Sequence, residues 1–134
     1  MSLRRAGVVL IIAVLALELG GAPAGAKNHR KHKGHSWASK ITLRHPSATR
    51  FRGQVASSLA ACFKGRLVNV FFTDPSGNSA LLSVQRADGK GRYEVDLTQA
   101  AYPGVYQAQA ARERIRAKKA PQTCKADASP IVGV

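Results

Sequence analysis

The feature that most constrains this fold is a two-residue alternation of apolar and polar side chains, repeated in short segments. Ile41 and Leu43, for example, alternate with polar neighbours, as expected for a strand with one buried face. Turn-forming residues at 46–48, 74–78 and 88–91 separate the segments. The pattern predicts an all-β, seven-stranded antiparallel sandwich over residues 39–134. The expected strands are Ser39–His45, Arg50–Ser57, Arg66–Thr73, Ser79–Arg86, Arg92–Leu97, Val105–Ala111 and Asp127–Val134.

Two segments have features of a helix. Residues 107–119 are rich in Ala, Gln, Arg, Glu and Lys, which are good helix formers. The regular alternation around Tyr106 favours a strand that runs into a basic loop instead. Residues 98–102 are expected to form a single helical turn before Pro103.

The N-terminus has the three parts of a secretory signal peptide. Arg4 and Arg5 precede an apolar run from Ala6 to Leu17, and Ala24-Gly25-Ala26 follows as a small-residue cleavage site. The run is shorter than the roughly 20 apolar residues that a membrane-spanning helix needs. We therefore expect residues 1–26 to form a signal helix that is removed. The mature protein is expected to be secreted, either extracellular or associated with the cell envelope.

The chain is strongly basic, with 21 Lys and Arg residues against 7 Asp and Glu, a formal net charge of +14. This charge indicates an anionic partner, and export favours a cell-envelope polymer or an acidic lipid surface. Residues 27–38 are expected to be a disordered basic arm, and residues 112–119 a basic loop. Specific nucleic-acid binding is not expected, because no aromatic residues interleave the second cluster. The candidate polyanion-binding residues are Lys27, Arg30, Lys31, Lys33, Arg112, Arg114, Arg116, Lys118 and Lys119.

The basic arm also carries three histidines, His29, His32 and His35. Short His-rich tracts can bind metal. Cleavage after Ala26 would leave a new N-terminus with His29 at its third position, an arrangement that chelates Cu(II) or Ni(II) in a square plane. The alternative is a solvated basic tail that contains histidines, and the sequence favours this second interpretation.

The two cysteines, Cys62 and Cys124, are an isolated pair in a chain predicted to be exported. This context predicts one disulfide, worth about 4 kcal/mol on the chain-entropy model. The alternatives are free thiols or a metal pair, and neither cysteine has a second Cys or His close by in sequence.

The sequence contains no catalytic motif, and we expect a non-catalytic protein without a cofactor. His45 is the only histidine outside the arm, so a Ser-His-Asp triad has a single candidate base. Asp88 lies in a predicted turn. Glu94 and Asp96 are two residues apart on the outward face of one predicted strand, where they are expected to pair with nearby cations.

Three motifs resemble those of transthyretin-like, carboxypeptidase-regulatory-like modules. They are Gly65–Phe71 with a G-R-x-V-x-V-aromatic pattern, Asp88–Val95 with a D-x-x-G-x-aromatic hairpin, and Pro103–Ala108 with a P-G-x-Y-x-A pattern. With the two cysteines, the chain is similar to small secreted actinobacterial proteins of immunoglobulin-like fold. The resemblance implies a non-catalytic sandwich in which Tyr106 is buried and gives its hydroxyl to a corner hydrogen bond.

The sequence as a whole therefore predicts a secreted, non-catalytic immunoglobulin-like module with a binding or structural role at the cell envelope. The alternative is a cationic secreted protein that binds a polyanion or a metal through its basic, His-rich arm. The protein partner stays unknown at this stage.

Signal cleavage gives a direct test of the predicted export. N-terminal sequencing of secreted protein is expected to begin at Lys27, because Ala24-Gly25-Ala26 forms the cleavage site. An intact Met1 on protein recovered from the cytoplasm would contradict the prediction.

Overall fold

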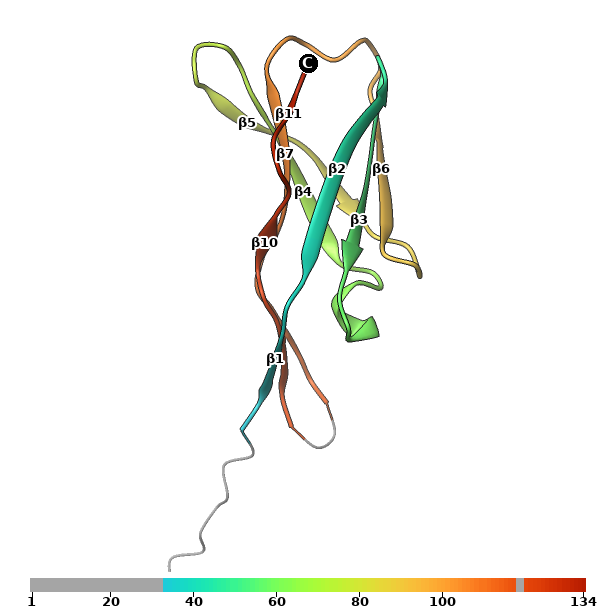
Figure 1. The fold of residues 1–134 in the computed structure, drawn as a ribbon, viewed down its shortest axis with the longest axis vertical. Helices are drawn as coiled ribbons and strands as arrows, with labels where there is room; N and C mark the ends of the chain where they lie inside the picture. The colour runs from blue at the N-terminus through green and yellow to red at the C-terminus, as the bar shows by residue number, and fades with distance from the viewer. Residues whose placement is uncertain (1–32, 118–119) are drawn as a thin grey trace, which may run out of the picture. The chain divides into compact units, whose positions relative to one another are not determined.

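The computed structural model describes residues 33–117 and 120–134, and this part of the chain is all-β (Figure 1). It contains one short 3₁₀ turn, η1 (Ala60–Cys62), and no α-helix. Within the described residues, no helix is long and apolar enough to cross a membrane. The strands are β1 (His35–Trp37), β2 (Lys40–Ser47), β3 (Arg50–Ala56), β4 (Leu67–Thr73), β5 (Ser79–Arg86), β6 (Arg92–Asp96), β7 (Val105–Ala110), β8 (Glu113–Ile115), β9 (Gln122–Cys124), β10 (Asp127–Ala128) and β11 (Val132–Gly133).

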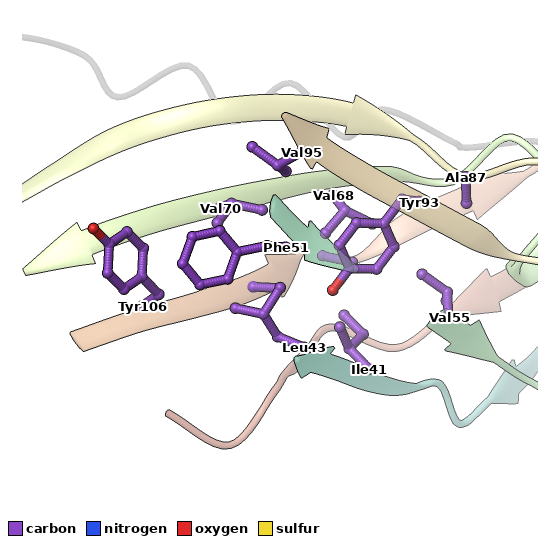
Figure 2. Close-up of a cluster of buried hydrophobic side chains, with 12 residues drawn as sticks. Ile41, Leu43, Phe51, Val55, Val68, Val70, Ala87, Tyr93, Val95 and Tyr106 are labelled. Carbon is purple, nitrogen blue, oxygen red and sulfur yellow. The ribbon is translucent and has the colours of Figure 1, made fainter. Parts of the chain in front are cut away.

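Two antiparallel sheets enclose the hydrophobic core. One has the strand order β2-β3-β6, and the other has the order β10-β7-β4-β5, with β11 also paired to β7. Inward side chains alternate with outward ones along β3 and β7, as the period-two pattern requires. Figure 2 shows side chains from both sheets pointing into the space between them. The core comprises Ile41, Leu43, Phe51, Val55, Val68, Val70, Ala87, Tyr93, Val95, Tyr106, Ala108 and Ala110.

Gly53 is required by the tyrosine that packs beside it. Gly53 of β3 pairs with Tyr93 of β6, and the Tyr93 hydroxyl donates a hydrogen bond to the Thr42 carbonyl on β2. A Cβ at Gly53 would lie 2.2 Å from the end of the Tyr93 ring. The ring therefore covers the glycine and links all three strands of this sheet, and burial raises the pKa of the Tyr93 hydroxyl.

A third, smaller sheet has the order β1-β9-β8. Strand β1 pairs with β9 in parallel, and β8 pairs with β9 as an antiparallel hairpin between β7 and β10. A disulfide joins Cys124 of β9 to Cys62, with a Cα–Cα distance of 5.4 Å, and the described residues include no free cysteine. The predicted disulfide is confirmed, and it anchors the third sheet to the β3–β4 connection.

The all-β prediction is confirmed, but the described residues contain eleven strands instead of seven. Six predicted strands correspond to β2–β7, and β7 runs as a strand where a helix over residues 107–119 was the alternative. The expected basic loop at 112–119 includes strand β8, and residues 35–37 of the expected disordered arm form β1. Residues 98–102 contain bends and no helical turn, so that expectation was wrong.

The predicted last strand, Asp127–Val134, is divided into β10 and β11, both paired with β7. Pro130 has no N–H to contribute to a ladder, and Ser129 compensates at this point. The Ser129 N–H donates to the Ala108 carbonyl over 2.8 Å, and its hydroxyl accepts from the Ala108 N–H over 3.0 Å. The backbone N–H and carbonyl groups of Ala108 in β7 thus keep hydrogen-bond partners between β10 and β11.

The expected hairpin at Asp88–Val95 is also corrected, since β5 and β6 belong to different sheets. The turn nevertheless forms around Asp88, whose carboxylate accepts hydrogen bonds from the N–H groups of Lys90 and Arg92. The Arg92 N–H is the main cause of the lowered pKa of Asp88. Gly91 has a φ of +78°, and a Cβ there would lie 2.2 Å from the Val55 carbonyl oxygen. The turn therefore carries the chain from one sheet to the other.

Loss of the disulfide is expected to destabilise the fold. The Cys62→Ser/Cys124→Ser variant should lose about 2–5 kcal/mol of unfolding free energy, because the bridge closes a long loop in the unfolded chain. Urea unfolding under non-reducing conditions measures the difference, and the wild type under reducing conditions should show the same loss. An unchanged unfolding midpoint in both experiments would contradict a stabilising bridge.

Candidate polyanion-binding surface

The third sheet presents an arginine-rich face. The register places Ser36 of β1, Thr123 of β9 and Arg114 of β8 in one row. Arg112 and Arg116 are two residues from Arg114 on either side, so they lie on the same side of an extended chain. All three arginines are exposed. We name Arg112, Arg114 and Arg116, with Ser36 and Thr123, the arginine face.

The opposite face of this sheet carries the aromatic residues. Trp37 and His35 lie in the rows on either side of Ser36, and their ring centroids are 6.4 Å apart. The Trp37 indole N–H donates a hydrogen bond to the side-chain oxygen of Gln122. The indole therefore contacts β9 of the same sheet. Because the rings are on the other face, they do not interleave with the arginines.

Arg66 holds the base of the β8–β9 hairpin. Its side chain is only 2% exposed, and its Nη2 donates to the carbonyl oxygens of Ala111 and Lys125. These two residues are the points where the chain enters and leaves the hairpin. Burial lowers the pKa of the guanidinium, and Glu113 acts in the opposite direction. Arg66 therefore closes the base of the hairpin through two carbonyl groups.

Arg66 also affects the charge of the arginine face. Its Nε lies 3.5 Å from the Glu113 carboxylate. Glu113 shares a row with Trp37 and Cys124, on the face opposite Arg114. The only acidic residue of β8 is thus directed away from the arginines and toward the buried guanidinium.

The outer face of the β2-β3-β6 sheet also carries many charges, but most of them are paired. Arg50 lies 2.5 Å from Asp96 and 3.2 Å from Glu94, and Arg52 lies 2.5 Å from Glu94. The hydrogen bond to Asp96 is the main cause of the raised pKa of Arg50. The predicted pairing of Glu94 and Asp96 with nearby cations is confirmed.

Two shallow hollows open on this paired face. One has a volume of about 470 Å³ and is lined in part by Arg52, Arg92 and Glu94. Arg92 forms its own ion pair with Asp88 over 3.0 Å. Arg44 lies directly opposite Arg52 and forms no ion pair with a described residue. Carboxylates already neutralise most of the charge on the outer face of the β2-β3-β6 sheet. The described part of the arginine face carries no carboxylate.

The structure brings together only part of the predicted site. Arg114 lies in β8, Arg112 and Arg116 flank that strand at the spacing of one extended face, and Lys33 is exposed just before β1. His35 lies in β1, and the described residues contain no cluster of three or more His, Cys, Asp or Glu residues that could hold a metal. The metal site therefore stays a prediction. The other candidates lie outside the described residues: Lys27, His29, Arg30, Lys31, His32, Lys118 and Lys119.

Three contributors to this surface could not be singled out from the sequence. Arg66 was recognised only as part of a family-like motif and as the first residue of the expected strand Arg66–Thr73, and its parity with Val68 and Val70 was the available signal. Ser36 and Thr123 have no signal of their own, because their role depends on the pairing of β1 with β9 across a long sequence separation. Comparison of the chain with protein-family models, curated proteins and solved structures finds no match.

Replacement of Arg66 is expected to loosen the hairpin. Arg66→Met should cost about 2–4 kcal/mol of unfolding free energy, because it removes charged hydrogen bonds to two carbonyl groups in a buried position. Amide hydrogen exchange should rise in β8 and β9 beyond its rise in β3. Arg52→Met is a matched control, since an exposed ion pair is worth about 1 kcal/mol or less. Equal losses in the two variants would contradict an anchoring role for Arg66.

Proposed function

We propose that the protein is an exported, non-catalytic immunoglobulin-like module that binds a linear anionic polymer of the cell envelope. The observation that carries the proposal is the arginine face, on which three exposed arginines share one side of an extended segment. A domain of this kind would hold the polymer by charge, with the sheets serving as a rigid support.

The strand order supports an immunoglobulin-like fold. Strands β2, β3 and β6 correspond to A, B and E, and the second sheet follows the order G-F-C-C′ as β10/β11, β7, β4 and β5. Tyr106 lies near the start of β7 and is buried, and its hydroxyl donates to the Tyr102 carbonyl over 3.0 Å. A tyrosine at this corner is a feature of such domains.

The chain departs from the antibody-type pattern in its disulfide. Cys62 lies in the β3–β4 connection and Cys124 in β9, so the bridge does not join strands B and F. The bridge instead fixes the additional sheet that carries the arginine face. The resemblance to transthyretin-like modules thus supports the two main sheets, and the binding surface belongs to a part that this family pattern does not supply.

The arrangement of the arginines favours a linear polymer. Alternate residues of a strand are about 6.8 Å apart, so the arginine face is a row of regularly spaced cations. A chain with regularly spaced phosphate or carboxylate groups can neutralise such a row along its length. The absence of aromatic side chains on this face disfavours a single-stranded nucleic acid, which gains affinity by stacking.

Export is supported by the chemistry of the disulfide. Disulfides persist in oxidising compartments and are rare in the reducing cytosol. Together with the N-terminal signal pattern, the Cys62–Cys124 bridge favours a protein that acts outside the cytoplasm.

The proposal predicts salt-dependent binding to a poly(glycerol phosphate) polymer. Removal of the row in Arg112→Gln/Arg114→Gln/Arg116→Gln should reduce the steepness of log K against log salt by about two to three, since each neutralised phosphate releases condensed counterion. Titration of labelled polymer over a series of salt concentrations measures this slope. The variant should stay folded, because none of its arginines belongs to the core.

A matched control separates the arginine face from the overall charge. Lys40→Gln/Lys64→Gln/Lys90→Gln removes the same charge from three exposed lysines, none of which makes a side-chain hydrogen bond to another described residue. This control should keep most of the wild-type affinity at a given salt concentration. Equal loss in both variants, or binding that does not depend on salt, would overturn the proposal. Stronger binding to anionic vesicles than to the polymer would assign the surface to lipid instead.

A further inference from the structure

The outer face of the β10-β7-β4-β5 sheet has almost no charge. On β4 and β5, the register places Leu67, Phe71, Leu81 and Val84 on this face, and their neighbours on β7 are uncharged. Arg86, at the end of β5, is the charged exception among the outward residues of these three strands. An uncharged apolar surface on a chain of net charge +14 indicates an interface.

Among the described strands, β5 is the edge of this sheet and pairs with β4 alone (Figure 1). Leu81 is 53% exposed and Val84 is 52% exposed. The strand contains no proline and no charged residue before Arg86. Prolines and charged residues are devices by which proteins usually protect a strand edge from pairing with another chain. β5 is therefore an exposed and apolar edge, and the protective device that it carries before Arg86 is a bulge at Leu82.

A bulge makes the facing pattern of β5 self-complementary. Pairing with β4 shifts at Leu82, so the outward residues are Ser79, Leu81, Val84 and Arg86. An antiparallel copy aligned with Leu81 opposite Val84 also aligns Ser79 opposite Arg86, and every outward residue then meets an outward residue. This alignment uses the whole strand and is isologous, as two-fold symmetry requires.

If a second copy binds, charge favours this edge over the two surfaces that carry arginines. Two chains of net charge +14 repel one another, and the uncharged face is where they can approach without bringing arginines together. In the alignment above, Arg86 of one copy lies opposite Ser79 of the other, next to the turn that contains Asp74. The two Arg86 side chains are thus at opposite ends of the paired strands, and each keeps its hydrogen bond to the Gly65 carbonyl of its own chain.

We propose that two copies of this chain form a symmetric dimer through antiparallel pairing of their β5 strands, with Leu81 opposite Val84. The pairing joins the two sheets into one continuous sheet and covers the apolar side chains of both edges. It uses none of the residues of the arginine face, so a dimer leaves both arginine faces open to the polymer.

The oligomeric state of the secreted chain tests the dimer. Sedimentation equilibrium of the wild type should give twice the mass of one chain. Leu81→Lys and Val84→Lys should each give the mass of a monomer, because a buried lysine would face the edge of the second copy. Ile131→Lys is the matched control, since Ile131 is 65% exposed and lies outside β5, and this variant should stay dimeric.

Salt and cross-linking provide two further measurements. Dimerisation should strengthen as salt screens the repulsion between the two cationic chains, whereas polymer binding should weaken. The double variant Leu81→Cys/Val84→Cys should form a covalent dimer on mild oxidation, and Leu81→Cys alone should not. A monomeric wild type would overturn the proposal, and so would equal dissociation of the Ile131→Lys control. A dimer without the specific cross-link would overturn the register.

Discussion

The packing of Phe51 against Tyr106 is the interaction on which the arrangement of the two main sheets depends. Phe51 belongs to β3 and Tyr106 to β7, and their ring centroids are 4.4 Å apart across the core (Figure 2). Phe72 packs on the same tyrosine at 5.0 Å, while the Tyr106 hydroxyl is held by the Tyr102 carbonyl. The tyrosine therefore joins both sheets and the connection between them, and it fixes which side chains remain outside.

The two outer faces that result have different physical character. The β2-β3-β6 face is charged and largely neutralised by its own ion pairs, whereas the β4–β5 face is apolar. The third sheet adds a cationic surface that neither main sheet could provide. Its position depends on covalent and buried polar contacts, through Cys62 and Arg66, and not on a hydrophobic core of its own. The arginine face is thus fixed to the main sheets by the disulfide at Cys62 and by the hydrogen bonds of Arg66.

The core strands could be predicted from the sequence because burial of one face imposes a local period of two. Val68 and Val70 carry that signal within a few residues. Strands β1 and β9 gave no such signal, since each has three residues and depends on a partner far away in sequence. The arginines could be proposed as a cluster from composition, but their common face depends on the register of β8. Arg66 shares the parity of Val68 and Val70, but its contacts depend on the β8–β9 hairpin far away in sequence, and only the structure shows them.

Dimerisation would change what the arginine face can achieve. Three arginines on one strand bind a polymer with limited affinity, because each exposed charge contributes little and is weakened by salt. Two arginine faces on one particle make the second contact with the same polymer intramolecular, so avidity can exceed the affinity of either face without any new residue. The apolar edge of β5 and the cationic face of the third sheet then have complementary roles. Their opposite dependence on salt allows the two contributions to be separated in one series of measurements, since raising salt strengthens the dimer while it weakens each contact to the polymer.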